Sequence, residues 1–258
     1  MLRPRIIPCL LIHNGGLVKT IQFSQHKYVG DPLNAVKIFN EKEVDELFVA
    51  DIDATVHNLE PNYKLISQLA AECRMPLCYA GGIKTPSQVE RIIGLGVEKV
   101  AISSAAIDNL ELIKEAVKIV GTQSIAVVLD VKKIGLLRQY EVFTHNGRQS
   151  TLQNPVDFAM RATQSGAGEI IINSIDRDGT MIGYDHELIS QIRQNITAPL
   201  TALGGARDLA DIKELVSRNG VMGAAAGSIF VFKGKYRAVL IQYPSQVERD
   251  SISLNFHG

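Results

Sequence analysis

The amino-acid sequence predicts an α/β fold, a (β/α)8 TIM barrel that comprises residues 1–258 as a single domain. Short apolar runs alternate along the chain with amphipathic windows, and apolar residues fill the runs almost completely, as in parallel strands covered on both faces. Eight strands alternating with eight helices imply a parallel sheet, and eight is the number that closes a barrel. The predicted strands are Arg5–Leu11, Glu46–Asp51, Leu77–Ala80, Lys99–Ser103, Ile125–Asp130, Glu169–Asn173, Leu200–Leu203 and Val221–Ala226.

Several of the predicted helices have a clear start or a clear apolar face. Asp31-Pro32, Thr85-Pro86 and Asn154-Pro155 each combine an N-cap residue with proline at the first helical position. Apolar residues recur at helical spacing within Leu110–Val117 and Leu209–Val216. We therefore expect helices to cover the strands on the outside of the barrel.

One segment departs from this alternation. Residues Val131–Thr151 follow the fifth strand and end in the turn His145-Asn146-Gly147. Because Asn-Gly between β-rich segments is typical of a hairpin turn, we expect a β-hairpin inserted after the fifth strand.

The chain also repeats itself with a period of about half its length. The matching segments are Asp51–Thr55 with Asp176–Thr180, Ala80–Ile83 with Leu203–Ala206, and Leu10-Leu11 with Leu129-Asp130. A barrel built from two four-stranded halves explains these matches. It also predicts a site of approximate twofold symmetry at the carboxyl ends of the strands, where the active sites of such barrels lie.

Composition excludes several classes of protein. Lys and Arg number 27, as do Asp and Glu, and this balance argues against a nucleic-acid partner. The longest apolar run, Val221–Phe232, is too short and too rich in glycine to span a membrane. The N-terminus lacks the pattern of a signal peptide. We expect a cytoplasmic protein without membrane or nucleic-acid partners.

The residues that commonly bind metals are not grouped in the sequence. Cys9, Cys73 and Cys78 are odd in number and lack metal-ligand spacing, which favours free thiols in a reducing compartment. No histidine falls near the strand-end aspartates at ligand spacing. We expect neither a metal nor a cofactor.

Two glycine pairs, Gly81-Gly82 and Gly204-Gly205, each follow a predicted strand. Glycines there expose backbone N–H groups, so each loop can bind a phosphate. In each half the next strand ends in hydroxyl-bearing or small residues, Ser103-Ser104 and Ala226–Ser228. The alternative is that the glycines only form tight turns. Two symmetry-related cradles favour a ligand with a phosphate at each end, held mainly by backbone N–H groups without an arginine.

Aspartates gather at the predicted mouth of the barrel. Asp51, Asp130, Asp176 and Asp178 lie at or just after strand ends, where carboxylates can act as general acids or bases. Alternatively they cap helices or fix loops, an explanation that suits Asp51 and its neighbour Asp53. Asp130 precedes a loop and has no obvious capping role, so we expect it to be catalytic and the other three to bind substrate.

Charged residues occupy strand starts at the opposite end of the barrel. Arg5, Glu46, Lys99 and Glu169 are predicted to meet there. Such a charged ring can be purely structural. Buried ion pairs often add little stability compared with apolar replacements, which leaves room for a function such as the plug of an axial passage.

These features together resemble the HisF family, the cyclase subunit of imidazole glycerol phosphate synthase. The resemblance covers residues 1 to about 235 and lies in RIIPCL, SIDRDGT, the two Gly-Gly turns and the aspartate at the end of the fifth strand. It implies a barrel that docks a HisH-type glutaminase subunit on its N-terminal face as a heterodimer. Ammonia then passes along the barrel axis to a bisphosphate ribonucleotide at the other face.

The resemblance also implies roles for single residues. Arg5, Glu46, Lys99 and Glu169 correspond to the family's ammonia gate. Asp130 corresponds to one catalytic aspartate, and Lys19 to the lysine of a mobile first loop. The positions that correspond to the family's phosphate sites are Gly82, Ser104, Gly205, Gly227 and Ser228.

The sequence departs from the family pattern at the predicted mouth. Leu11 replaces the second catalytic aspartate, and Leu203 replaces a serine before the second glycine pair. Ser103 replaces an asparagine and Ala101 a serine. A general acid–base group contributes roughly 10²–10⁴-fold in rate, so Leu11 should cripple ring closure without preventing ammonia delivery.

We therefore expect a HisF-type synthase subunit of a glutamine-dependent amidotransferase complex that delivers ammonia to a phosphate-bearing substrate. The altered mouth resembles a paralogous branch linked to sugar amidination for surface polysaccharide (lipopolysaccharide), which works with a separate sugar amidotransferase. The main alternative is the cyclase of histidine biosynthesis, and a third possibility is a non-catalytic scaffold that activates the glutaminase. A sugar-phosphate isomerase is disfavoured, because it would also need a carboxylate at position 11.

Overall fold

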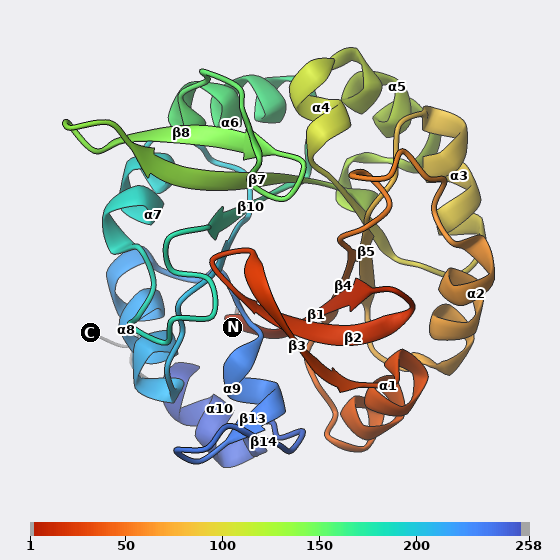
Figure 1. Ribbon diagram of the computed structural model, residues 1–258. Helices are drawn as coiled ribbons and strands as arrows, with labels where there is room; N and C mark the ends of the chain where they lie inside the picture. Colours follow the sequence, from red (N-terminus) through yellow and green to blue (C-terminus); the bar gives the residue numbers. More distant parts are fainter. Residues whose placement is uncertain (1–2, 254–258) are drawn as a thin grey trace.

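A computed structural model describes residues 3–253, in which eight parallel strands close into a barrel surrounded by helices (Figure 1). Each strand pairs with the next one around the barrel, and the last pairs with the first. In their order around the barrel they are β1 (Arg5–His13), β4 (Leu47–Asp51), β5 (Leu77–Ala80), β6 (Lys99–Ile102), β7 (Ile125–Ile134), β10 (Glu169–Ser174), β11 (Leu200–Leu203) and β12 (Gly223–Ala226). The eight predicted strands are confirmed.

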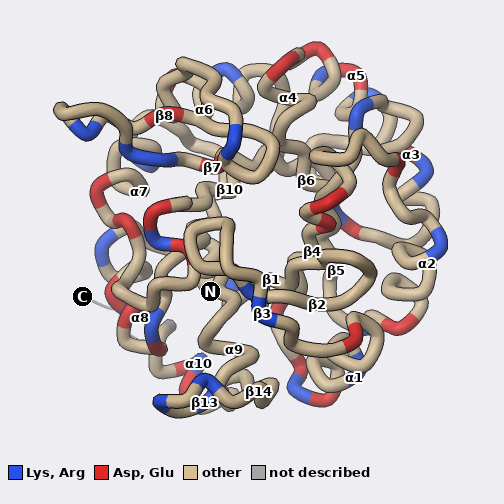
Figure 2. The backbone as a smooth tube through the Cα atoms, in the orientation of Figure 1, with Lys and Arg blue, Asp and Glu red and all other residues tan. Residues whose placement is uncertain are grey.

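Helices form the outer layer of the barrel. The Asp31, Thr85 and Asn154 side chains each accept a hydrogen bond from the first turn of the following helix, as their N-cap patterns predicted. Lys and Arg alternate with Asp and Glu over this layer (Figure 2). The helices are α1 (Pro32–Glu41), α2 (Tyr63–Glu72), α3 (Pro86–Gly94), α5 (Glu111–Val120), α6 (Pro155–Gln164), α7 (His186–Arg193), α8 (Leu209–Asn219) and α10 (Gln246–Ser253), with a short 3-10 turn at Thr122–Ser124.

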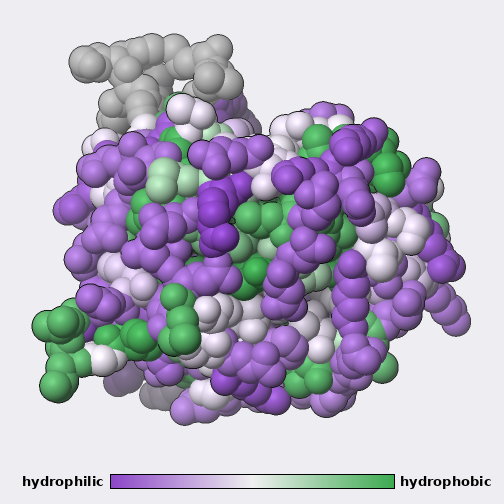
Figure 3. Space-filling model, turned by 90° about the horizontal axis from the view of Figure 1, so that it is seen from above, coloured by the Kyte–Doolittle hydropathy of each residue, from purple (hydrophilic) through white to green (hydrophobic). Residues whose placement is uncertain are grey.

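The hairpin predicted after the fifth barrel strand is confirmed, but its turn lies elsewhere. β7 continues beyond Asp130 and pairs with β8 (Gln139–Thr144) around a turn at residues 135–138. The Asn146-Gly147 turn instead connects β8 to the short β9 (Gln149–Ser150). The first turn carries Leu136 and Leu137, which are fully or largely exposed. An apolar projection extends at the left of Figure 3, the side on which the β7–β8 hairpin lies in Figure 1.

A second hairpin follows the first barrel strand and was not predicted. β2 (Gly16–Ile21) pairs antiparallel with the end of β1 and with β3 (Ser24–Gly30). It occupies in the first half of the barrel the place that β8 and β9 occupy in the second half. The hairpin therefore extends the twofold repeat and brings Lys19 over the barrel mouth.

Short elements follow the fourth and eighth barrel strands in the same symmetric way. α4 (Ser104–Asp108) comes after β6, and α9 (Ser228–Val231) comes after β12. A small hairpin of β13 (Phe232–Lys233) and β14 (Ala238–Val239) follows α9. No helix within residues 3–253 is long and apolar enough to cross a membrane.

The core consists of two shells separated by the barrel wall. The outer shell packs one face of the strands against the helices. The inner shell fills the barrel and includes Ile7, Cys9, Phe48, Cys78, Ala101, Ala126, Val128, Ile171, Leu203 and Ala225. Because strand residues alternate between the two faces, Arg5, Ile7, Cys9 and Leu11 of β1 all point towards the axis, in successive layers.

Candidate functional site

A cavity of about 680 Å³ opens at the carboxyl ends of the barrel strands. Its lining includes ten of the eleven predicted substrate-binding and catalytic residues: Lys19, Asp51, Gly82, Ser103, Ser104, Asp130, Asp178, Gly205, Gly227 and Ser228. Asp176 does not belong to this lining, although a substrate-binding role was expected for it. Its Oδ2 instead accepts a hydrogen bond of 2.8 Å from the backbone N–H of Lys133 and so fixes the start of the β7–β8 hairpin.

The first glycine pair lies beside the first of two predicted anion cradles. Gly82 has a φ of +72°, and a Cβ there would approach the Leu59 carbonyl oxygen to 2.9 Å. Glycine is therefore required by the turn itself, whether or not a phosphate binds. Ser104 starts α4 beside it, and the hydroxyl of Ser103 is buried without a hydrogen-bond partner among the described residues. That hydroxyl is free to accept a hydrogen bond from a ligand or to donate one to it.

The second glycine pair occupies the symmetric position. Gly205 has a φ of +101°, and a Cβ there would come within 2.2 Å of the Gly183 carbonyl oxygen. Gly227 and Ser228 lie next to it at the end of β12 and also line the cavity. The cavity thus has two similar polar ends.

Asp130 is the polar group between these two ends. Its Oδ1 accepts a hydrogen bond of 2.9 Å from the Asn173 side-chain amide. The pKa of Asp130 is raised to about 7, mainly because the carboxyl group is buried. The hydrogen bond from Asn173 lowers the pKa and the charge of Asp178 raises it, so the hydrogen bond opposes the effect of burial only in part. A carboxyl group with this pKa can both give and take a proton near neutral pH.

Lys19 reaches into the cavity from β2. Its ammonium group donates a hydrogen bond to the Cys9 carbonyl oxygen and lies against Gly227, where a Cβ would collide with it. Burial lowers the pKa of Lys19, opposed by the nearby Cys9 and Asp178 side chains. The lysine is therefore close to the second cradle but already has a backbone partner.

The other predicted aspartates mainly fix loops. Asp51 Oδ1 accepts hydrogen bonds from the backbone N–H groups of Asp53 and Ala54, at 3.0 and 3.1 Å. Asp178 Oδ2 accepts hydrogen bonds from the Thr20 hydroxyl at 2.6 Å and the Phe23 N–H at 3.2 Å. Asp178 therefore ties the β2–β3 hairpin to the loop after β10, while both aspartates remain in the cavity lining.

Leu11 and Leu203 make the floor of the cavity apolar. Both line it, and both pack with the inner shell of the barrel. Neither side chain can exchange a proton or donate a hydrogen bond. These two leucines therefore add no acidic group to the cavity, and the carboxylate whose charge affects Asp130 is that of Asp178.

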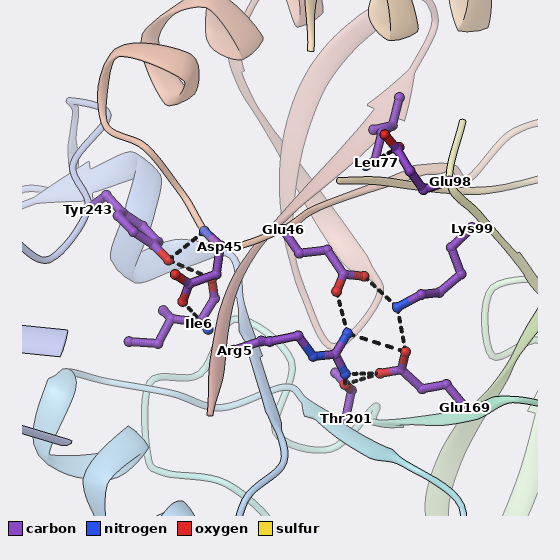
Figure 4. A network of polar contacts seen from close by, with 10 residues as sticks. All are labelled: Arg5, Ile6, Asp45, Glu46, Leu77, Glu98, Lys99, Glu169, Thr201 and Tyr243. Carbon is purple, nitrogen blue, oxygen red and sulfur yellow. Dashed lines mark hydrogen bonds and ion pairs between the residues drawn. The ribbon is translucent and has the colours of Figure 1, made fainter. Parts of the chain in front are cut away.

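The four predicted gate residues form a closed ring of ion pairs at the opposite end of the barrel (Figure 4). Arg5 bonds both Glu46 and Glu169, with an Nη2–Oε1 distance of 2.7 Å to Glu169. Lys99 Nζ bonds the same two carboxylates at 2.9 and 2.6 Å. The Thr201 hydroxyl also donates to Glu169 and was not predicted to take part.

Attraction between opposite charges keeps the groups of this ring ionised, although burial favours their neutral forms. Burial alone would raise the pKa of Glu169, but the charges of Lys99 and Arg5 hold it at about 2. The same pairing raises the pKa values of Arg5 and Lys99, although burial opposes the effect in both. Arg5, Lys99 and Glu169 are therefore charged near neutral pH, and the axis is closed by a salt-bridged layer.

Sequence reasoning missed three polar groups at the mouth. Asn173 is the next-to-last residue of β10 and donates a hydrogen bond to Asp130, a role that its position after an apolar run could have indicated. Lys84 follows the first glycine pair and lines the cavity. Arg237 donates a hydrogen bond of 3.2 Å to the Ser228 hydroxyl from the far side of the β13–β14 turn, and the sequence alone does not reveal this contact. Among residues 3–253, no three His, Cys, Asp or Glu side chains are grouped so as to hold a metal ion.

Comparison with known proteins agrees with this arrangement. The histidine biosynthesis protein family matches residues 5–237. A Leptospira borgpetersenii protein whose provisional name is imidazole glycerol phosphate synthase subunit HisF is 54% identical over 252 residues, or 98% of this chain and 99% of the relative. Proteins with provisional names hisF3 in Vibrio vulnificus and hisF2 in Pseudomonas aeruginosa are 53% and 50% identical, each covering 95% or more of both chains. The chain therefore belongs to the histidine biosynthesis protein family, as a HisF-like synthase subunit.

Proposed function

We propose that this chain is the synthase subunit of a glutamine-dependent amidotransferase complex. A HisH-type glutaminase docks on the N-terminal face of the barrel and releases ammonia there. The ammonia passes the ring of Arg5, Glu46, Lys99 and Glu169, crosses the barrel interior and reaches a phosphate-bearing substrate in the cavity.

The observation that carries this proposal is the placement of the ion-paired ring on the barrel axis, at the end opposite to the cavity. The layers between ring and cavity consist of apolar and thiol side chains such as Ile7, Cys78 and Ile171. An apolar interior favours passage of a small neutral molecule and disfavours an ion. Opening the ring requires only that side chains change partners, because each carboxylate is already shared between two cations.

The exposed N-terminal rim supplies candidate contacts for the glutaminase. Glu98 and Gln123 are exposed on this face beside the strand starts. Glu98 Oε2 accepts a hydrogen bond of 2.7 Å from the Leu77 N–H, so this carboxylate already has a structural role (Figure 4). We infer that Gln123 is the freer of the two to contact a partner, since its side chain donates only a 3.4 Å bond to Val120 within its own turn.

We infer that the substrate belongs to sugar amidination for surface polysaccharide, together with a separate sugar amidotransferase. Leu11 and Leu203 support this branch, because they remove the second acid and add bulk at the point where ring closure would need proton transfer. Ammonia delivery needs neither group. We place the protein in the cytoplasm, where it would pass glutamine-derived ammonia to the sugar pathway.

The second candidate is the cyclase reaction of histidine biosynthesis. Asp130 favours it, since a carboxyl group with a pKa of about 7 is suited to general acid–base catalysis. The relatives' provisional names also point to this reaction.

Two measurements separate the candidates. The first is turnover of the family's bisphosphate ribonucleotide with ammonium salt by the purified chain. Turnover at the rate of a two-aspartate relative would overturn the sugar-amidination proposal in favour of the cyclase. The second is the glutaminase rate of a purified HisH-type protein from the same organism, with and without the chain. Unchanged glutaminase activity and no detectable complex would overturn the amidotransferase proposal.

A further inference from the structure

The β13–β14 hairpin brings an arginine to the second cradle. Arg237 Nη2 lies 3.2 Å from the Ser228 hydroxyl, and the guanidinium group stacks 4.7 Å from the centre of the Phe232 ring. Its Nε is shielded from solvent and has no hydrogen-bond partner among the described residues. The guanidinium thus has spare donors beside a residue that lines the cavity.

The hairpin is fixed well enough to position this side chain. The backbone N–H of Arg237 donates a hydrogen bond of 3.0 Å to the Gly234 carbonyl oxygen across the turn. The carbonyl oxygen of Arg237 accepts a hydrogen bond of 2.9 Å from Lys27 Nζ on β3. The Gln242 side-chain amide holds the following segment to the carbonyl oxygens of Ile229 and Phe232. The hairpins on either side of the second cradle are therefore directly joined.

The internal repeat shows why the second cradle needs a cation from elsewhere. Lys84 follows the first glycine pair and lines the cavity, so the first cradle has a cation from its own loop. Arg207 holds the same position after the second pair, but it forms ion pairs with Asp208 at 3.0 Å and Asp211 at 3.2 Å. Neither Arg207 nor Arg237 belongs to the cavity lining, but Arg207 is paired with two carboxylates, whereas Arg237 contacts Ser228, which does belong to the lining.

We propose that Arg237 is a substrate-binding residue, which supplies the positive charge of the second anion subsite formed by Gly205, Gly227 and Ser228. The ligand is a phosphate monoester of the substrate, held by the guanidinium fork together with the Ser228 hydroxyl. This inference rests on the proposed phosphate-bearing substrate, and it adds a residue that neither glycine turns nor strand ends reveal.

Arg237 suits this role better than the nearby Lys19. The Lys19 ammonium is committed to the Cys9 carbonyl oxygen, and burial lowers its pKa. A guanidinium stays charged at every accessible pH, and its planar donors match two phosphate oxygens. A purely structural Arg237 would only pack on Phe232 and hold the Ser228 hydroxyl, and its loss would leave anion binding unchanged.

The test measures binding of inorganic phosphate to the full chain by calorimetry, with crystals soaked in phosphate to locate the occupied subsites. Arg237→Gln should weaken the second subsite roughly 10- to 100-fold, as loss of a charge-assisted hydrogen bond does. Density should disappear beside Ser228 and remain beside Ser104. Arg237→Lys should recover part of the affinity. Lys235→Gln removes the same charge from an exposed position in the same hairpin turn and should change nothing.

Each outcome decides one claim. Phosphate at both subsites of the Arg237→Gln variant, with affinities within twofold of the unmodified protein, overturns the role of Arg237 and leaves the two-cradle site intact. Phosphate at neither subsite of the unmodified protein overturns the phosphate-bearing substrate itself, and the inference with it. An ion beside Ser228 in the soaked crystal that calorimetry does not detect is an adventitious ion only and also counts against the inference. A thermal melt of each variant shows whether lost binding reflects lost folding.

Discussion

The Asn173 side-chain amide donates a 2.9 Å hydrogen bond to Oδ1 of Asp130, across two neighbouring barrel strands. The two residues are aligned in register on β10 and β7, so the barrel itself sets this contact. The amide favours the charged carboxylate, but burial outweighs it and the pKa of Asp130 rises to about 7. The carboxyl group of Asp130 therefore titrates near neutral pH.

This titration makes the stability of the protein depend on pH. The folded-state pKa of Asp130 is about 7, compared with 3.8 for an ordinary aspartate, so the folded protein retains a proton that the unfolded chain releases. The stabilising contribution is complete below the unfolded pKa and is lost as pH rises through the folded one. We expect the free energy of unfolding to fall relative to Asp130→Asn between these two values, by up to about 4 kcal/mol.

Denaturant unfolding of both proteins at a series of pH values measures this difference. Asp157→Asn removes an exposed carboxylate from the first turn of α6 and serves as the control for the loss of one negative charge. Asn173→Ala removes the hydrogen bond that favours the anion and should extend the slope to higher pH. A constant difference between the unmodified protein and Asp130→Asn across the range would show that Asp130 stays ionised.

The turn glycine of the second cradle should be far more sensitive than a glycine of the same conformation in open space. Gly205→Ala combines a φ of +101° with a Cβ only 2.2 Å from a backbone oxygen. Gly15→Ala has a φ of +76° and nothing within 4 Å of the added atom. We expect Gly15→Ala to cost about 1 kcal/mol and Gly205→Ala at least 3 kcal/mol or failure to fold. Thermal melts compare the two, and equal losses would mean that the Gly205 turn can relax.

The fold was predictable because its signals are local and repeated. Buried parallel strands are almost wholly apolar, so their positions follow from composition, as at β5 and β11, whose bounds match the prediction. The Asn146-Gly147 signal was correct as a turn but belongs to β8 and β9, because β7 itself runs on to Ile134. The β2–β3 hairpin was missed because its polar second strand lacks apolar alternation.

The site was less predictable, because its missing members depend on contacts between distant segments. Strand ends and glycine turns located the cavity and the two glycine loops that line it. They could not show that Asp176 faces the Lys133 backbone, or that Arg237 returns to Ser228 from a later hairpin. The expectation that no arginine is needed at the cradles considered only the loops that form them.

The chain should lack useful cyclase activity with free ammonia. Leu11 leaves Asp130 as the single acid of the pair, and an absent general acid–base group lowers the rate by roughly 10²–10⁴-fold. Leu11→Asp alone should restore little activity, because Leu203 still crowds the site and belongs to the same apolar cluster. Leu11→Asp with Leu203→Ser should restore more. Ammonium-dependent turnover of the ribonucleotide measures all three, and robust activity of the unmodified chain would contradict the prediction.

The ring at the bottom of the barrel should control the coupling of glutamine hydrolysis to product. Lys99 bonds both Glu46 and Glu169, so Lys99→Ala leaves two mostly buried carboxylates with Arg5 as their remaining cation. We expect the ammonia formed per glutamine to reach product less often, while activity with added ammonium salt survives. The measurement is product formed per glutamine hydrolysed, with the glutaminase present, together with a thermal melt.

Lys114→Ala provides a matched control, because Lys114 forms an exposed ion pair with Glu111 at 2.9 Å on α5. Exposed pairs contribute at most about 1 kcal/mol to stability, so this variant should melt at the same temperature as the unmodified protein and couple glutamine hydrolysis to product equally well.

Losing one partner of a buried pair typically costs about 3–5 kcal/mol, so a structural ring also predicts a lower melting temperature for Lys99→Ala. The two explanations differ in what happens well below that temperature. If the ring is a gate, coupling is lost while the variant is fully folded. If it is only a stabilising layer, coupling stays normal until unfolding begins, and that result would eliminate the gate.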